Sequence, residues 1–500
     1  MKQKAVIIGG GIGGLATAIL LAKKGFEVEL VEKNEKIGGR ANVFEAQGFK
    51  FDMGPSWYLM PDVFEHFFNL VGEKIEDHLE LQQLTPSYRI FFKDEGKVLD
   101  LQSNVAEDKK LFESLEPGSG AKLEEYLALS KIQYEIAVKD FMYKNYDSIF
   151  DFFNKRVMTE GRKLSVLSKM NKYVERFFKS EIIQKIMQYQ LVFLGSSPYN
   201  TPALYNIMSH IDFNMGVFYP KGGIYKIIEA LVTIAKKNGV VFRTSSPVGK
   251  IIIENKKTTG VELESGEVIA ADLVISNADI EHTEMKLLPK ESQTLKERYW
   301  KKRTMAPSAF IMYIGMKDKV PSLTHHNLIF CKDWKKNFAE IFDNPQWPDD
   351  PSLYVCCPSK TDPTVAPEGK ENLFVLVPVA SGLEYDDATL DAYKDKILSI
   401  MEKEMNIPNF KNRIEYIRTY SLKDFAKDYN AYKGSALGLA HTIMQTAFFR
   451  PNNRSKKVSN LYYVGAGTNP GIGMPICLIS AELAYKRIMN ITDPEPLKKL

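Results

Sequence analysis

One short segment near the start of the chain restricts its fold more than any other feature. Lys4 to Ile8 is a β-branched run typical of a buried parallel strand, and it leads directly into Gly9-Gly10-Gly11-Ile12-Gly13-Gly14. Helical spacing follows over Leu15 to Lys24, and a second strand-like run over Glu27 to Val31 ends at Glu32. This order of strand, glycine turn, helix and strand predicts a βαβ unit at the start of a parallel sheet.

Each element of this unit has a role in binding a dinucleotide. Gly9 permits the tight turn, Gly11 lets the backbone approach a pyrophosphate, and Gly14 allows the helix to pack closely on the strand. Glu32 can accept hydrogen bonds from ribose hydroxyls, and its charge disfavours a 2′-phosphate. A tight turn without a ligand is the alternative, but the helix, second strand and terminal acid together favour a binding site. Its predicted residues are Gly9, Gly11, Gly13, Gly14, Glu32 and Lys33.

Three further glycine turns favour a cofactor longer than NAD. Gly38-Gly39-Arg40 closes the next connection and supplies a cation for a diphosphate, and Gly54-Pro55-Ser56 follows soon after. Near the other end of the chain, a strand-like run is followed by the turn Gly465 to Pro475 and then by a helical pattern. The N-terminus of that helix can stabilise negative charge on a reduced flavin. Binding motifs at both ends of one chain therefore predict FAD.

These motifs together resemble the carotenoid desaturases of the bacterial phytoene-desaturase type, within the glutathione-reductase-like flavoproteins. The resemblance extends over nearly the whole chain and includes Pro61-Asp62-Val63, Pro220-Lys221-Gly222-Gly223, Ser276-Asn277-Ala278-Asp279 and Gly465 to Pro475. It implies that Val248 lies on a strand whose backbone meets the adenine. The other FAD-binding residues that it implies are Gly38, Gly39, Arg40, Gly54, Pro55, Ser56, Gly465, Ala466, Gly467, Gly473, Met474 and Pro475.

The resemblance also implies an enzyme. Its expected reaction introduces C=C bonds into an acyclic or monocyclic carotenoid of about 30 to 40 carbons, by hydride transfer to FAD. Ile224-Tyr225 follow the Pro-Lys-Gly-Gly motif, where multi-step phytoene desaturases usually carry smaller residues. This departure favours a narrower reaction late in a pathway, such as a 3,4-desaturation. The alternatives are a carotenoid isomerase of the same fold, an amine or protoporphyrinogen oxidase, and a non-enzymatic isoprenoid-binding chaperone.

Charge and composition restrict the partners. A formal net charge of +4 is too small to indicate nucleic-acid binding. We expect neither a membrane span nor a secretory leader, because no run of about 18 apolar residues occurs and Lys4 already begins a strand pattern. The cysteines, at positions 331, 356, 357 and 477, lack paired spacing and the seven histidines are scattered, so the sequence predicts a reduced chain without a metal site.

A basic segment in the middle of the chain has the pattern of a membrane contact. Residues 150–190 hold nine Lys and Arg against four acidic residues, with apolar residues at helical spacing between them. An amphipathic helix packed on the protein is the alternative interpretation. A bare carotenoid would cost on the order of 30 kcal/mol to place in water, so we expect a cytoplasmic enzyme bound to the inner face of the cell membrane. Trp300 to Arg303 is expected near the tunnel mouth, and quinone and oxygen are the candidate electron acceptors.

The predicted fold class is α/β, with three parts built from separate segments. Residues 1–75, 221–285 and 455–495 are predicted to form a Rossmann-like FAD-binding domain. Residues 76–120, 195–220 and 286–454 are predicted to form a discontinuous, sheet-based substrate domain, and residues 121–194 a helical, membrane-facing subdomain. No catalytic residue is assigned, because nothing in the sequence selects among Asp52, Asp279 and Glu482 as proton acceptors.

Overall fold

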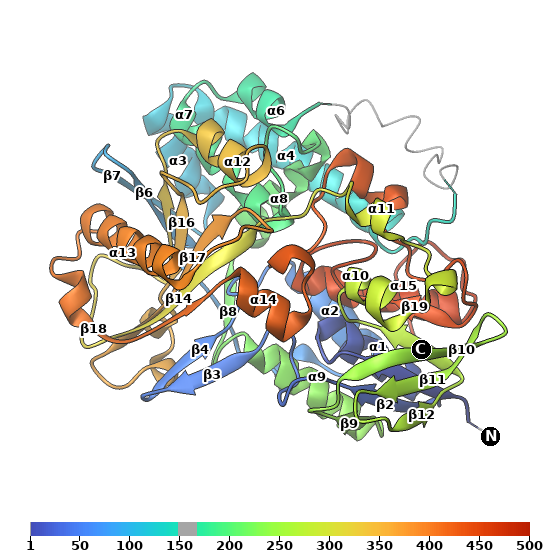
Figure 1. Ribbon diagram of the computed structural model, residues 1–500. Coiled ribbons are helices and arrows are strands. Elements are labelled where there is room, and N and C mark those ends of the chain that lie inside the picture. Colours follow the sequence, from blue (N-terminus) through green and yellow to red (C-terminus); the bar gives the residue numbers. More distant parts are fainter. Residues whose placement is uncertain (1, 149–167) are drawn as a thin grey trace.

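A computed structural model describes residues 2–148 and 168–500, which form two sheets with helices around them (Figure 1). The first sheet has five parallel strands in the order β19 (Leu461–Tyr463), β13 (Leu273–Ser276), β1 (Lys4–Ile8), β2 (Glu27–Val31) and β9 (Val241–Arg243). The predicted βαβ unit lies at its centre, where α1 (Ile12–Lys23) connects β1 to β2. The sheet therefore joins segments from both ends and the middle of the chain.

Helices cover one face of this sheet, and a small antiparallel sheet covers the other. The helices are α1, α2 (Pro61–Leu70), α9 (Tyr225–Lys237) and α15 (Met474–Ile488), which share an apolar cluster with Ile7 and Leu30. Strands β10 (Val248–Glu254), β11 (Lys257–Leu263) and β12 (Val268–Ala270) pack against Val6, Val31 and Val274. Strand β1 is buried on both faces of the sheet. A ligand can therefore bind at the carboxyl end of β1, where the glycine turn begins.

The second sheet has seven strands and lies beside the first (Figure 1). Their order is β18 (Ile414–Tyr420), β14 (Ser308–Met316), β17 (Glu371–Val379), β16 (Leu353–Cys356), β15 (His326–Phe330), β6 (Tyr88–Phe92) and β7 (Lys97–Leu101), and only the β15–β6 pair is parallel. Phe310 and Met312 of β14 face α13 (Asp387–Glu404), whereas Ile311 and Tyr313 face the opposite side. That opposite side is covered by helices α3 (Val105–Leu115), α4 (Ser119–Ala137), α6 (Met170–Phe177) and α7 (Glu181–Ile186).

Helices α6 and α7 lie in the described part of the predicted membrane segment, and apolar side chains of both pack inward. Met170, Tyr173 and Val174 are buried, and the Tyr173 ring lies 5.6 Å from that of Tyr126 in α4. The described part of this segment thus follows the alternative interpretation, a helix packed on the protein. The expectation for residues 150–167 lies outside the described residues. No helix in the described ranges is both long and apolar enough to cross a membrane.

Short elements connect the two sheets. The hairpin β3 (Val43–Ala46) and β4 (Phe49–Asp52) contacts the second sheet, and β5 (Leu81–Gln83) pairs with β8 (Phe218–Pro220). Helices α12 (Trp334–Phe342) and α14 (Leu422–Tyr429) flank the second sheet. The predicted α/β class and Rossmann-like unit are confirmed, and the division into three domains stays a prediction.

Candidate cofactor and substrate cavity

A large cavity lies between the two sheets and the helical part. Its volume is about 1120 Å³, whereas sites for one small molecule usually have roughly 300–1,000 Å³. Glycine turns and polar side chains line one part of it, and large apolar side chains line the rest. The cavity therefore has room for more than one small ligand and two different kinds of wall.

The first glycine turn places the start of α1 in the cavity wall. Gly9 has a φ of +98°, which favours glycine, and a Cβ on Gly14 would lie 2.2 Å from the carbonyl oxygen of Gly9. Gly11, Ile12 and Gly13 line the cavity, and no side chain caps the helix that begins there. The amides of the first helical turn can therefore bind an anion in the cavity.

The glycine turn from the other end of the chain meets the first one directly. A Cβ on Gly13 would lie 3.0 Å from the amide nitrogen of Gly465 and 2.7 Å from Oδ1 of Asn277. Nδ2 of Asn277 also donates a hydrogen bond to the carbonyl of Gly9, at 3.3 Å. Helix α15 follows Gly473, again without a side-chain cap, and its first residue, Met474, is in the cavity wall. Two helix N-termini thus open into one cavity.

Glu32 forms the end of the cavity where a ribose is expected. Its two carboxylate oxygens accept hydrogen bonds from the amides of Gly10 and Asn34, each at 2.8 Å. Each oxygen retains a second lone pair, so the carboxylate can also accept from ribose hydroxyls. Val248 is in the wall at this end together with Glu264. The ammonium group of Lys33 donates to the carbonyl of Lys427 and to Oδ1 of Asn430, at 2.5 and 3.1 Å, and burial lowers the pKa of Lys33.

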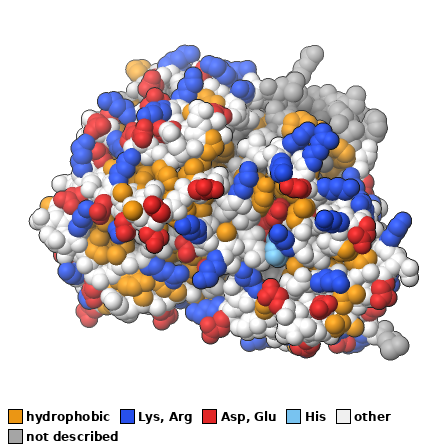
Figure 2. Space-filling view, in the orientation of Figure 1, with side chains coloured by type: hydrophobic (Ala, Val, Ile, Leu, Met, Phe, Trp, Pro, Cys, Tyr) orange, Lys and Arg blue, Asp and Glu red, His pale blue; other side chains and the backbone are white. Residues whose placement is uncertain are grey.

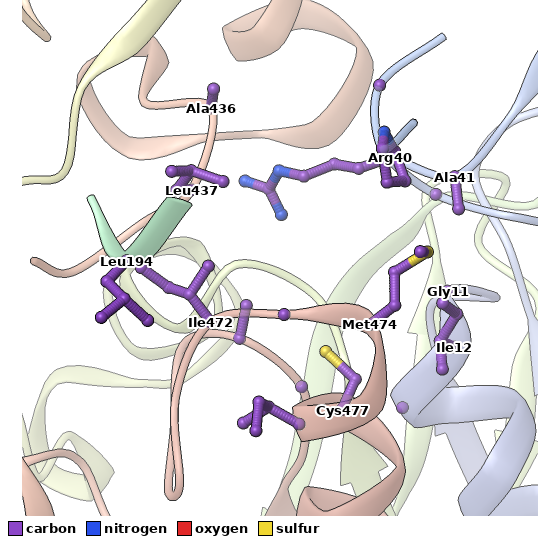
Figure 3. A pocket seen from close by; sticks show the side chains of 18 of the residues that line it. Gly11, Ile12, Arg40, Ala41, Leu194, Ala436, Leu437, Ile472, Met474 and Cys477 are labelled. Carbon is purple, nitrogen blue, oxygen red and sulfur yellow. The ribbon is translucent and has the colours of Figure 1, made fainter. Parts of the chain in front are cut away.

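Arg40 extends into the cavity opposite Met474 and Cys477 of α15 (Figure 3). Its guanidinium lies 5.6 Å from the centre of the Tyr429 ring. Within the described part of the chain, its Nε is a buried donor without an acceptor. A cation with a free donor beside two uncapped helix N-termini fits the diphosphate of FAD. The residues present therefore fit the cofactor that the sequence predicts.

Gly14 and Gly467 are the two predicted binding residues outside the cavity wall. Gly14 contacts Gly9, and a Cβ on Gly467 would lie 3.0 Å from the Ile280 side chain, so both glycines permit close packing of the turns. All the others lie in the wall, namely Gly9, Gly11, Gly13, Glu32, Lys33, Gly38, Gly39, Arg40, Gly54, Pro55, Ser56, Val248, Gly465, Ala466, Gly473, Met474 and Pro475.

Arg450 supports the C-terminal turn and could not be predicted from the sequence. This buried side chain donates to the carbonyls of Ala466 and Thr468, at 2.6 and 2.9 Å, and to those of Leu439 and Gln445, at 3.3 Å. Burial lowers its pKa to about 10. Arg450 lies outside the glycine motif and had no sequence signal. Asn277 did have one, because it belongs to the motif Ser276 to Asp279.

Beyond the glycine turns, apolar side chains form most of the cavity wall. The acidic residues of the wall are Glu32, Glu264, Asp279 and Asp428, and each interacts electrostatically with Lys33 or Arg40 at the cofactor end. The other part is lined by Trp57, Leu59, Met60, Ile136, Phe141, Met142, Val192, Leu194, Leu204, Ile207, Met208, Ile211, Leu328, Phe330 and Phe338. This part suits a long hydrocarbon.

The candidate proton acceptors have different positions. Asp52 accepts hydrogen bonds from the amides of Ile224 and Tyr225, at 2.8 and 3.1 Å, and burial raises its pKa to about 6. Glu482 is buried beside His66. Neither is in the cavity wall, whereas Asp279 is.

Two titratable side chains of the wall bear on proton transfer. Asp279 accepts hydrogen bonds from backbone amides at the start of the short helix α10 (Ile280–His282), and burial raises its pKa. His441 stacks with Tyr205, with ring centres 5.5 Å apart, and burial holds its pKa well below the usual range. His441 could not be predicted from the sequence, because an isolated histidine has no motif around it.

Comparisons with known proteins agree with this geometry. Residues 12–489 match the family described as flavin containing amine oxidoreductase. A carotenoid 3,4-desaturase of Haloarcula japonica is 47% identical over 96% of this chain and 97% of that protein. A zeta-carotene-forming phytoene desaturase of Myxococcus xanthus is 39% identical over 98% of this chain and 94% of that protein.

Among solved structures, an oxidoreductase from Methanosarcina mazei superimposes with a TM-score of 0.65 at 19% identity, over 97% of this chain and 100% of that one. At this identity, the likeness shows the fold alone. The relatives confirm the expected resemblance to carotenoid desaturases, and the matched family confirms a flavin-dependent oxidoreductase with FAD as its cofactor. The chain therefore belongs to the flavin-containing amine oxidoreductase family, alongside the carotenoid desaturases.

Proposed function

We propose that this protein is an FAD-dependent carotenoid desaturase, and that its reaction is a 3,4-desaturation late in a carotenoid pathway. The relative named carotenoid 3,4-desaturase, 47% identical over nearly the whole length of both chains, supports this reaction over the earlier phytoene steps. Ile224, which precedes α9, and Tyr225, its first residue, depart from the phytoene pattern, and their backbone amides donate hydrogen bonds to Asp52. They do not line the cavity, and the narrower reaction therefore rests on the relative.

The observation that carries the proposal is the continuity of the cavity. The glycine turns at residues 9–13 and 465–475 and the apolar side chains of the helical part line one space. A substrate that enters the apolar part therefore reaches the residues that would hold the cofactor. Bound FAD supplies the hydride acceptor for removal of hydrogen from a C–H bond.

The residues of the chain orient the reactants and exclude water. Arg40 and the N-termini of α1 and α15 would hold the anionic part of the cofactor. The apolar wall desolvates the polyene and places neighbouring C–H bonds in one orientation. The proton released with the hydride needs an acceptor, and His441, His282 and Asp279 are among the titratable residues of the wall.

The product test separates the desaturase from its alternatives. Purified flavin-containing protein is incubated without oxygen with carotenoids in liposomes, with and without a quinone, and the products are analysed by chromatography and mass spectrometry. A desaturase forms a product two hydrogens lighter, at most one per bound flavin without the quinone and many per flavin with it. A product of unchanged mass formed without the quinone would instead show an isomerase, and peroxide release from amines in air an oxidase.

We also propose that the cavity mouth contacts a membrane surface. Phe449 lines the cavity and is 39% exposed, and the nearby Met444 is 59% exposed. Arg303 stacks on Tyr299 at 4.4 Å and donates to the carbonyl of Met444 at 3.4 Å, and the exposed Lys301 and Lys302 precede it. Figure 2 shows Lys and Arg side chains beside hydrophobic ones in the region of α11 (Glu297–Trp300). Apolar side chains edged by cations fit an anionic lipid surface.

A matched pair of substitutions tests this membrane contact. Met444→Glu should lower recovery with anionic liposomes in flotation by about tenfold, because it removes partly exposed apolar surface and adds a repelled charge. Val268→Glu is the control, since Val268 is 57% exposed on β12, away from the mouth. If both variants float with the liposomes as well as the unsubstituted protein does, this surface does not contact the membrane.

A further inference from the structure

Three buried side chains meet behind the cavity wall in the second sheet. His325 directly precedes β15, His326 begins it, and Cys356 pairs with His326 from the neighbouring strand β16. One ring nitrogen of each imidazole and Sγ of Cys356 all lie within 4.8 Å of one another. The spacing of about thirty residues gives no ligand motif, which is why the sequence predicted no metal site.

The hydrogen bonds of the two imidazoles leave one nitrogen of each ring without a partner. Nδ1 of His325 lies 2.8 Å from Oγ1 of Thr361, and Nδ1 of His326 lies 2.7 Å from the Tyr354 hydroxyl. Within the described ranges, both Nε2 atoms are buried and have no hydrogen-bond partner. Histidines that bind metals usually show this arrangement, with one nitrogen held by a protein group and the other free for the ion.

Two acidic side chains act electrostatically on this cluster. Asp362 acts on His325 and Asp52 on Cys356, both through their negative charge. Cys356 and Asp52 also border a cavity of about 20 Å³, which is large enough for one water molecule.

We propose that His325, His326 and Cys356 bind a divalent transition-metal ion, with Zn²⁺ as the preferred ion. Two imidazole nitrogens and a thiolate form a ligand set that zinc favours. Binding releases the thiol proton of Cys356 to solvent, and no oxidant or reductant is needed. Ligand atoms around tetrahedral zinc lie roughly 3.4–3.6 Å apart, so the side chains would draw together by at most about 1 Å.

The position of the cluster indicates a structural role for the ion. The ring of His326 stacks on that of Trp57, with centres 4.1 Å apart and planes 9° apart, and Trp57 lies in the cavity wall. The ion would tie β15 to β16 and fix the ring on which Trp57 rests. This inference concerns a second site and is independent of the desaturase proposal.

Metal content measured on the flavin-containing protein tests the site. Because the three side chains are buried, the protein is produced in zinc-supplemented medium so that the ion enters during folding. We expect about one zinc per chain by mass spectrometry, and an X-ray absorption spectrum with one sulfur at about 2.3 Å and nitrogens at about 2.0–2.1 Å. Cys356→Ser should lower the zinc content about tenfold, whereas the control Cys357→Ser, at the next buried cysteine, should not.

Two results would overturn the proposal. One is unsubstituted protein that carries less than about a tenth of an equivalent of zinc under these conditions. The other is the same zinc content in the unsubstituted protein and in Cys356→Ser, which would mean an ion bound elsewhere on the surface. Circular dichroism shows whether Cys356→Ser folds. If it does not, the X-ray absorption spectrum of the unsubstituted protein tests the proposal instead. A spectrum of bound zinc without a sulfur ligand would exclude Cys356 as a ligand and overturn the proposal.

Discussion

At the scale of single residues, a substitution of Gly11 should weaken cofactor binding without disturbing the fold. Its φ is −77°, a conformation open to any residue, and a Cβ there would meet only Nδ2 of Asn277, at 3.0 Å. Gly11→Ala should therefore fold but retain less than about a tenth of the flavin, because the methyl group occupies the approach of the pyrophosphate. Flavin absorbance per chain measures this. Gly249→Ala is the control, since its nearest atoms lie 3.5 Å or more away, and full retention by Gly11→Ala would contradict the predicted cofactor position.

Asp212 makes stability depend on pH. Its Oδ2 accepts hydrogen bonds from the hydroxyls of Tyr88 and Tyr189, at 2.8 and 3.1 Å, and from Nε2 of Gln190 at 2.8 Å. Burial nevertheless raises its pKa to about 6. The folded state therefore holds this proton more tightly than the unfolded state, whose carboxyl has a pKa of about 3.9. The resulting stability is fully present below about pH 4 and is lost as the pH rises through about 6.

Asp212→Asn removes this titration. The free energy of unfolding of the variant, relative to the unsubstituted protein, should rise by about 2–3 kcal/mol between pH 4 and pH 7. Urea unfolding at several pH values measures the difference. A difference that stays constant across this range would mean that Asp212 has an ordinary pKa in the folded protein.

At the scale of elements, the C-terminal glycine turn depends on Arg450. The guanidinium donates to four carbonyl groups, and a lysine ammonium cannot reach all of them. Arg450→Lys should therefore lower the free energy of unfolding by about 2–4 kcal/mol and speed flavin loss. Arg454→Lys is the control, because Arg454 is a surface residue paired with Asp147 and should change stability by less than about 0.5 kcal/mol. Denaturant unfolding and flavin release rates measure both effects.

Elements specified by a short sequence pattern could be predicted, whereas contacts between distant parts of the chain could not. Glycine turns are visible in the sequence because only glycine permits a φ such as that of Gly9 or the contact between Gly14 and the Gly9 carbonyl. The pairing of β6 with β15 joins residues about 240 positions apart, and no local pattern specifies it. The carbonyl groups that Arg450 contacts lie 5 to 18 positions away in irregular loops, and His326 meets Cys356 across an antiparallel strand pair. Neither arrangement has a sequence motif, so neither could be predicted.

The inward packing of α6 has a similar explanation. Its apolar stripe fits a membrane surface and a protein core equally well, because both cover hydrophobic side chains. The position of α4, with Tyr126 against Tyr173, decides between them, and that position follows from the tertiary fold. The sequence did not indicate that Met444 is exposed near the cavity mouth, since single surface methionines are common.

At the scale of the whole molecule, both sheets contribute to one cavity, so the cofactor should stabilise the protein as a unit. Flavin at one hundred times its dissociation constant adds about 2.7 kcal/mol to the free energy of unfolding. Differential scanning calorimetry should show the main transition shifted upward by a few degrees in the flavin-bound protein relative to the flavin-free protein. If two transitions appear and flavin moves only one of them, the cofactor is held by one part of the molecule alone.

The contact between the turns at residues 9–13 and 465 also sets an order of events during synthesis. The first turn leaves the ribosome about 450 residues before its counterpart. Capture of the cofactor must therefore wait until the second turn has been synthesised. A nascent chain halted before residue 465 has its first strands and helix but lacks half of the binding surface, so premature termination yields colourless protein rather than partly active enzyme.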